Sequence, residues 1–295
     1  MKHLTTAAPS ALAYFATLVA EDEGFALIEA AICVAHDDHP GLDAQTVLAD
    51  IDRLAGRLQA RLPADAPPLY RLKALNQFFF GELGFAGNVN NYYDRRNSYL
   101  HEVLGSRRGI PITLALLYCE MANQLGLTAH GVSFPGHFLI KLRMPQGEVV
   151  IDPFDGRSLS RDDLDERLAP YRARQGLEGD FETPLGLFLQ VSPPRDVLAR
   201  LLYNLKEIHR AAEDWPRLLA LQHRLVLLLP SALEEVRDRG LTWAELGRPR
   251  EAVGDLAAYL AGRPEADDAA ALRERLAELR ERLAELRRGG QPGLQ

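Results

Sequence analysis

One helix followed by a β-hairpin constrains the fold of this chain more than any other feature. Pro111 suits the first turn of a helix, because a missing N–H costs nothing there, and Gly126 suits the residue just after a helix end. Between them, apolar residues recur every three or four positions, as on one face of a buried helix. They are Leu114, Leu117, Met121 and Leu125. The segment therefore predicts a helix in the core of its domain.

Three strands are predicted after that helix. Residues 129–134, 137–143 and 148–152 are rich in β-branched or aromatic residues, and a Pro-Gln-Gly turn separates the last two. His137 opens the second strand and Asp152 ends the third. Neighbouring strands would bring the two side chains together, in the layout of a Cys-His-Asp site for amide chemistry.

The segment before this centre is predicted to be helical, with a polar loop near its end. Apolar residues recur at helical spacing across residues 10–62 and again from Leu69 to Phe80. Residues 88–98 are rich in Asn and Asp, which favour turns. Such loops often carry function, but an ordinary connector fits the composition equally well.

Residues 195–266 carry a repeat. Pro230 and Pro264 lie 34 residues apart, which is the period of tetratricopeptide repeats. A Pro-Pro pair predicts a boundary between a first domain at residues 1–192 and these repeats. Because two units are fewer than such repeats usually need, we expect them to lean on a neighbouring element.

The tail, residues 267–295, contains a duplicated seven-residue segment. Its leucines are spaced four and three residues apart, as in a heptad seam. They are Leu272, Leu276, Leu279, Leu283 and Leu286. About two heptads are short for a coiled coil, which usually needs three or four. A helix that caps the repeats is the favoured interpretation, and a weak homodimer contact is the alternative.

Composition narrows the class of protein. The 295-residue chain has a formal net charge of −7, whereas nucleic-acid binders are usually basic. No apolar run approaches the ~18 residues that suggest a membrane span, and the N-terminal residues show no signal-peptide pattern. Cys33 and Cys119 both lie in helical patterns, which favours free thiols in a reducing compartment. We expect a cytoplasmic protein without a cofactor, whose partner is neither nucleic acid nor membrane.

The motifs of the centre resemble the transglutaminase-like superfamily, and more closely a bacterial branch that joins such a domain to C-terminal tetratricopeptide repeats. The likeness rests on Gly-Ile-Pro-Ile-Thr, Pro-Gly-His-Phe-Leu and Ile-Asp-Pro-Phe, and covers roughly residues 10–265. It implies an α+β, papain-like domain with an N-terminal helical region, followed by an all-α repeat domain. In active members a cysteine opens the central helix, a histidine is the base and an aspartate orients it. His137 and Asp152 match the last two.

The resemblance implies a nucleophilic cysteine at the start of the central helix. If we count back from Gly126 by the usual helix length, Pro111 stands at that position. Proline offers no nucleophile, and a slip of two residues would offer only the Thr113 hydroxyl. Cys119 lies about 12 Å further along the helix axis. A thiol there would act as a small apolar residue of the core.

Two functions remain open on these observations. The first is a non-catalytic, scaffold or regulatory protein that retains a vestigial dyad and binds a protein or peptide, through the repeats or the His137 cleft. The second is a hydrolase or transferase for amide bonds that uses His137 and Asp152 with an unusual nucleophile such as Thr113. The expected lining of the cleft is Asn97, Arg108, Pro111 and Phe138.

Two groups of residues could bind a metal in principle. His36 to His39 form a polar run, but consecutive residues at a helix end do not share one face, so a solvated turn is favoured. His101, His137 and Asp152 would offer a second set, although no spacing in the sequence supports it. The sequence therefore predicts no metal site.

Overall fold

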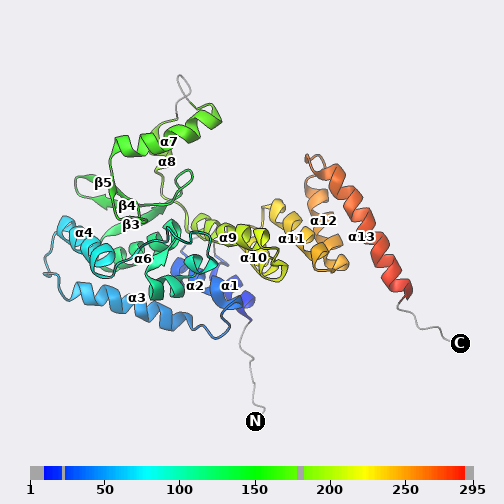
Figure 1. The fold of residues 1–295 in the computed structure, drawn as a ribbon, viewed down its shortest axis with the longest axis horizontal. Coiled ribbons are helices and arrows are strands. Elements are labelled where there is room, and N and C mark those ends of the chain that lie inside the picture. Colours follow the sequence, from blue (N-terminus) through cyan, green and yellow to red (C-terminus); the bar gives the residue numbers. More distant parts are fainter. Residues whose placement is uncertain (1–9, 22–23, 178–182, 290–295) are drawn as a thin grey trace, which may run out of the picture. The chain divides into compact units, whose positions relative to one another are not determined.

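The computed structural model describes residues 10–21, 24–177 and 183–289. The chain divides into two compact units, one of residues 21–201 and one of residues 1–20 with 202–295. The first combines helices with a small sheet, and the second is helical (Figure 1). The fold is thus α+β, with a separate helical-repeat region.

The first unit has a four-stranded sheet and helices on both sides of it. Its helices are α2 (Leu27–Cys33), α3 (Ala44–Gln59), α4 (Pro68–Asn76), α5 (Leu100–Ser106), α6 (Pro111–Gln124), α7 (Arg161–Gln175) and α8 (Leu185–Phe188), with 3₁₀ turns at Val34–Asp37 and Arg95–Ser98. Its strands are β1 (Ala86–Gly87), β2 (Arg108–Gly109), β3 (Thr128–Val132), β4 (Leu139–Met144), β5 (Gly147–Ile151) and β6 (Ser158–Leu159).

The sheet runs β3-β4-β5-β6, and every neighbouring pair is antiparallel. Its side chains alternate between two faces. Helix α6 packs against β3 and β4. On the opposite face, α7 contributes to the core that the strands bury (Figure 1). That core contains Val132, Leu139, Val150, Leu159, Leu164 and Leu168.

The β4–β5 register places the ends of the hairpin side by side. Ile140 pairs with Ile151, so Asp152 directly follows β5 close to where β4 begins. His137 lies in a turn before β4 and not in the strand itself, in contrast to the prediction. Its N–H donates to the carbonyl of Phe134 at 3.0 Å. This turn bond keeps His137 out of the strand, which begins at Leu139.

Helix α6 is buried over its first two turns, as its sequence predicts. Pro111 is its first residue, and Gly126 follows its end with a φ of +74°. The Thr113 hydroxyl accepts the N–H of Ile110 at 3.2 Å. This bond satisfies a backbone donor that would otherwise have no partner at the helix start.

The helix predicted from Leu69 to Phe80 changes form at its midpoint. α4 ends at Asn76, and residues Gln77–Glu82 continue as a π-helical turn. Phe79 stacks on Phe85 with ring centroids 4.3 Å apart and meets Tyr118 of α6 edge-on at 5.3 Å. The wider turn therefore places adjacent aromatic rings in the core beside α6.

Helix α7 is longer than the short helices predicted for residues 160–194. It is 15 residues long and continues through Pro170 without a break. Ser160 and Asp163 form a capping box, in which each side chain accepts the backbone N–H of the other residue. This start fixes the direction of α7, which also positions Arg167.

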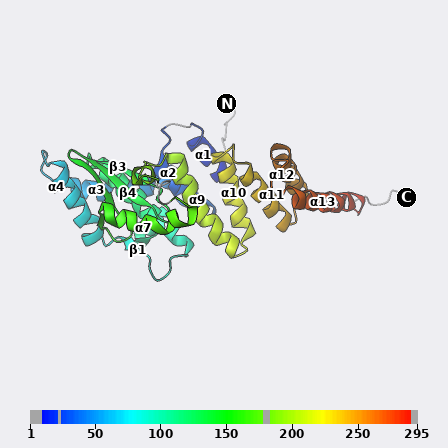
Figure 2. The same cartoon turned by 90° about the horizontal axis from the view of Figure 1, so that it is seen from above.

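The second unit is a succession of helices, and from Trp215 onward each helix packs against the next (Figure 2). Its elements are α1 (Ala11–Leu18), the end of α9 (Pro194–Ala211), α10 (Trp215–Leu228), α11 (Leu233–Glu245), α12 (Pro249–Gly262) and α13 (Ala269–Gly289). α1 packs on α10, where Phe15 is fully buried and the Arg224 guanidinium lies 5.5 Å from its ring. No helix among the described residues has the length and apolar character needed to cross a membrane.

The tail helix α13 turns one side of its leucine seam toward α12. Leu272, Leu276 and Leu279 are buried in a common cluster with Leu256 and Tyr259. Leu286, at the far end of the seam, is 60% exposed. The buried half of the seam thus covers the last repeat helix within the chain.

Leu276→Ala should lower the free energy of unfolding by about 2–4 kcal/mol, because it leaves a cavity in this cluster. Leu286→Ala, the matched control, should change it by less than about 0.5 kcal/mol. Urea unfolding followed by far-UV circular dichroism measures both. If both variants lost the same free energy of unfolding, and if that loss depended on protein concentration, the leucine seam would instead be a homodimer contact.

Candidate functional site

The structure brings His137 and Asp152 into direct contact. Nε2 of His137 lies 2.8 Å from Oδ1 of Asp152. The histidine side chain is 24% exposed and that of the aspartate 5%. One ring edge is therefore held by a buried carboxylate, while part of the ring reaches solvent.

Two further donors hold the Asp152 carboxylate. Oδ1 also accepts the N–H of Phe154 at 2.9 Å, and Oδ2 accepts a bond from Arg167 at 2.6 Å. Burial alone would raise the pKa of Asp152, but the bonds from His137 and Arg167 outweigh it and lower the pKa to about 2. The group is thus ionised at neutral pH. Arg167 was missed by sequence reasoning, because nothing in the pattern of α7 points to the dyad.

A second arginine fixes the turn that carries His137. Arg200 donates to the His137 carbonyl at 2.7 Å and to the Phe134 carbonyl at 3.4 Å. Its guanidinium also lies 5.6 Å from the centre of the Phe138 ring. The backbone of the turn that carries the histidine is therefore also held by hydrogen bonds, and no sequence signal indicated this role for Arg200.

The residues at the start of α6 offer no exposed nucleophile. Pro111 is buried, and Thr113 is fully buried. The Thr113 hydroxyl lies 2.8 Å from the Asn97 carbonyl and 3.0 Å from the Ile110 carbonyl. Its one proton goes to one of these oxygens, so the hydroxyl serves the backbone of the helix start. Burial raises the pKa of the Cys119 thiol to about 12, which leaves it protonated at neutral pH.

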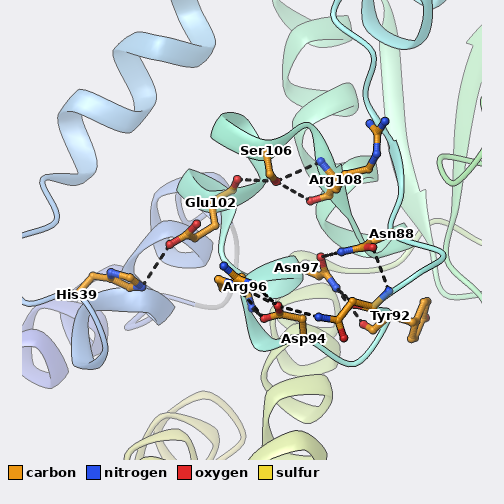
Figure 3. Close-up of polar contacts among 10 residues, drawn as sticks. His39, Asn88, Tyr92, Asp94, Arg96, Asn97, Glu102, Ser106 and Arg108 are labelled. Carbon is orange, nitrogen blue, oxygen red and sulfur yellow. Dashed lines mark hydrogen bonds and ion pairs between the residues drawn. The ribbon is translucent and has the colours of Figure 1, made fainter.

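Asn97 and Arg108, two of the expected cleft residues, hold backbone in place, and Figure 3 shows the contacts of Asn97. The Asn97 amide donates to the carbonyls of Asn91 and Tyr92 at 2.6 and 3.1 Å, and its oxygen accepts from Asn88 at 2.9 Å. Arg108 donates to the carbonyl of Gly84 at 2.6 Å. Asn97 thus shapes the loop of residues 88–98, while Arg108 supports the short β1–β2 pair.

Phe138 lines a cavity of about 600 Å³ between α2, α6, β3 and residues 191–194. Cys119 and the exposed His130 line the same cavity. The Phe138 ring covers Gly131, where a Cβ atom would lie 2.6 Å from it. Only glycine fits beneath this ring without a shift.

The loop of residues 88–98, which the sequence marks only as polar, carries an aromatic surface next to the dyad. Tyr92 and Tyr93 are 42% and 80% exposed, and their rings meet edge-on. The Tyr92 ring lies 6.3 Å from that of Phe154, whose N–H bonds to Asp152. We call Val89, Tyr92 and Tyr93 the loop-88 surface. The composition of residues 88–98 marks this loop in the sequence, and its two adjacent tyrosines are the further signal that could have indicated an aromatic surface.

His101 does not join His137 and Asp152 in a metal site. It lies instead beside His39, with ring centroids 4.5 Å apart, and near the carboxylate of Glu102. His39 comes from the first group of possible metal ligands in the sequence and His101 from the second. The two histidines therefore lie together at a site that neither group predicted.

Asp152→Asn should lower the free energy of unfolding by about 2 kcal/mol at neutral pH. The pKa of this carboxyl is lower in the folded than in the unfolded chain, so its ionised form stabilises the folded state at every pH above the unfolded-state pKa. The difference from wild type should shrink to roughly half at about pH 3 and vanish below the folded pKa. Denaturant unfolding at several pH values measures it. The control is Asp155→Asn, at an exposed neighbour, and a pH-independent loss from Asp152→Asn would contradict the expectation.

Comparison with known proteins identifies the family of this chain. Residues 45–203 match the model of the transglutaminase-like superfamily, and residues 205–277 that of the tetratricopeptide repeat. A UPF0162 protein of Xylella fastidiosa is 35% identical over 259 residues, which are 88% of this chain and 91% of the relative. UPF0162 proteins of Pseudomonas aeruginosa (30% over 253 residues, 86% and 90% of the two chains) and Escherichia coli (28% over 226 residues, 75% and 81%) also match. The chain belongs to the transglutaminase-like superfamily.

Proposed function

We propose that this chain is a non-catalytic transglutaminase-like protein that binds a protein or peptide in the cytoplasm. The observation that carries the proposal is the residue that opens α6. Where the superfamily places its nucleophile, this chain has Pro111, which is buried at the first position of the helix. The nearby Thr113 hydroxyl is bonded to the backbone. Amide chemistry through a covalent intermediate would therefore have no nucleophile at the start of α6.

The His137–Asp152 pair has a sufficient structural role. Asp152 accepts hydrogen bonds from the turn before β4, from the loop after β5 and from Arg167 on α7. Removing any of these donors would leave a buried charge less well compensated. The pair thus contributes to the stability of the fold, with or without catalysis.

The loop-88 surface is the favoured contact for a partner. Val89 and Tyr93 are 77% and 80% exposed, although the loop beneath them is fixed by the buried Asn97 amide. Aromatic side chains on a fixed backbone bind with a small loss of conformational freedom. Because Tyr92 contacts Phe154, a peptide bound here would run beside His137. The repeats offer a second surface of a kind that commonly binds proteins.

A hydrolase that uses water as its nucleophile is the second candidate. His137 is partly exposed, and its Nε2 faces Asp152. Within the part of the chain that the structure describes, Nδ1 has no hydrogen-bond partner. That nitrogen could therefore accept a proton from a water molecule that attacks an amide.

Peptides selected from a random display library on the full-length protein test the proposal. We expect Tyr93→Ala to weaken the binding of a selected peptide at least about tenfold, as loss of an aromatic anchor does. Tyr70→Ala, which removes a 51% exposed tyrosine from α4, should leave affinity unchanged. Fluorescence anisotropy measures both. Equal affinity of wild type and Tyr93→Ala for every selected peptide would exclude the loop-88 surface as the binding site.

The same peptides separate the two candidate functions. After prolonged incubation, mass spectrometry should find them intact with the wild type and with His137→Ala alike. Cleavage by the wild type that His137→Ala abolishes would establish the hydrolase in place of the binding protein.

A further inference from the structure

Two histidines and a glutamate meet on the side of the first unit where the turn after α2 lies against α5. His39 follows the 3₁₀ turn at Val34–Asp37, and His101 and Glu102 lie in the first turn of α5. The potential ligand atoms of all three lie within 4.8 Å of one another. All three side chains are half-buried, at 36%, 18% and 34% exposure for His39, His101 and Glu102.

The spacing of these atoms suits a bound ion better than a hydrogen bond. Nε2 of His39 and Nε2 of His101 lie 3.9 and 3.8 Å from Oε1 of Glu102. Hydrogen bonds between such groups are about 2.7–3.2 Å long. Two ligands of a tetrahedral ion, at ~2.0–2.2 Å from it, are separated by roughly 3.3 Å. A closure of about half an ångström would therefore bring each nitrogen to this separation from the Glu102 oxygen.

Packing, and not hydrogen bonding, sets the position of the two imidazoles. The His39 and His101 rings meet edge-on at 4.5 Å, and Tyr99 packs on both, at 5.6 and 6.1 Å. Tyr99 is itself held by a bond from its hydroxyl to Asp38 at 2.8 Å. Nδ1 of His101 is buried and has no hydrogen-bond partner among the described residues. No hydrogen bond of its own accounts for where this ring lies.

We propose that His39, His101 and Glu102 bind a divalent transition-metal ion of the Zn²⁺ class. Two imidazoles and one carboxylate are ligands that Zn²⁺, Co²⁺ and Fe²⁺ share, whereas Mg²⁺ and Ca²⁺ prefer oxygen alone. Three protein ligands leave a position for water, as the partial exposure of the cluster requires. The ion would join the turn after α2 to the start of α5, and it is independent of the peptide site.

Isothermal titration of Zn²⁺ into the full-length chain, freed of any affinity tag, tests the site. We expect one ion per chain, with micromolar or tighter affinity, and little binding of Mg²⁺. His39→Ala, His101→Ala and Glu102→Gln should each weaken Zn²⁺ binding at least about tenfold. Glu102→Gln preserves side-chain volume, so it serves if a histidine variant fails to fold. The visible spectrum of the Co²⁺ form should change with the same three variants.

Two histidine variants serve as controls. His130→Ala removes an exposed imidazole from β3, and His137→Ala removes the one that faces Asp152. Both should bind Zn²⁺ as the wild type does. Loss of binding in His137→Ala alone, unchanged affinity in the three cluster variants, or no stoichiometric binding by the wild type would each overturn the proposal.

Discussion

A buried, ionised carboxylate at the end of β5 determines how this centre is built. Asp152 stays charged only because donors reach it from three directions: the His137 ring, the Phe154 N–H and the Arg167 guanidinium. Each donor comes from a different segment, so the hairpin, the loop after it and α7 must all be in place for the charge to be compensated. The same contacts orient His137. A histidine–aspartate pair of this kind can therefore be held in place for structural reasons, whether or not the site is catalytic.

The segment from Asn88 to Thr113 connects that centre to the rest of the first unit. Asn97 fixes the loop-88 surface through its side chain and receives the Thr113 hydroxyl at its carbonyl. Between these two residues lie His101 and Glu102, which meet His39 (Figure 3 shows the His39–Glu102 contact). The proposed ion would join α5, which lies between Asn97 and Thr113 in the sequence, to the turn after α2.

Sequence reasoning reached the parts of this structure that depend on local pattern or on pairing of adjacent strands. Pro111 and Gly126 mark the ends of α6 because backbone geometry favours them there, and the Pro-Gln-Gly turn sets a hairpin that joins His137 to Asp152. Arg167 could not be foreseen, because its contact depends on the angle at which α7 crosses the sheet. The meeting of His39 with His101 is likewise a matter of tertiary packing between segments that share no period. The sequence shows that Thr113 has a hydroxyl near the expected nucleophile. It does not show that this hydroxyl contacts the Asn97 carbonyl, because that contact depends on how the two segments pack.

Placing a thiol at position 111 tests most directly whether the start of α6 is where the nucleophile of a catalytic site would stand. The measurement is the rate of iodoacetamide alkylation of Pro111→Cys against pH, with and without His137→Ala. A thiol at a helix start beside an imidazole has a lowered pKa, so we predict alkylation below neutral pH that His137→Ala shifts to about the ordinary thiol range near pH 8.5. A thiol that titrates in the ordinary range in both backgrounds would contradict the account, because Pro111 would then not stand where the nucleophile belongs.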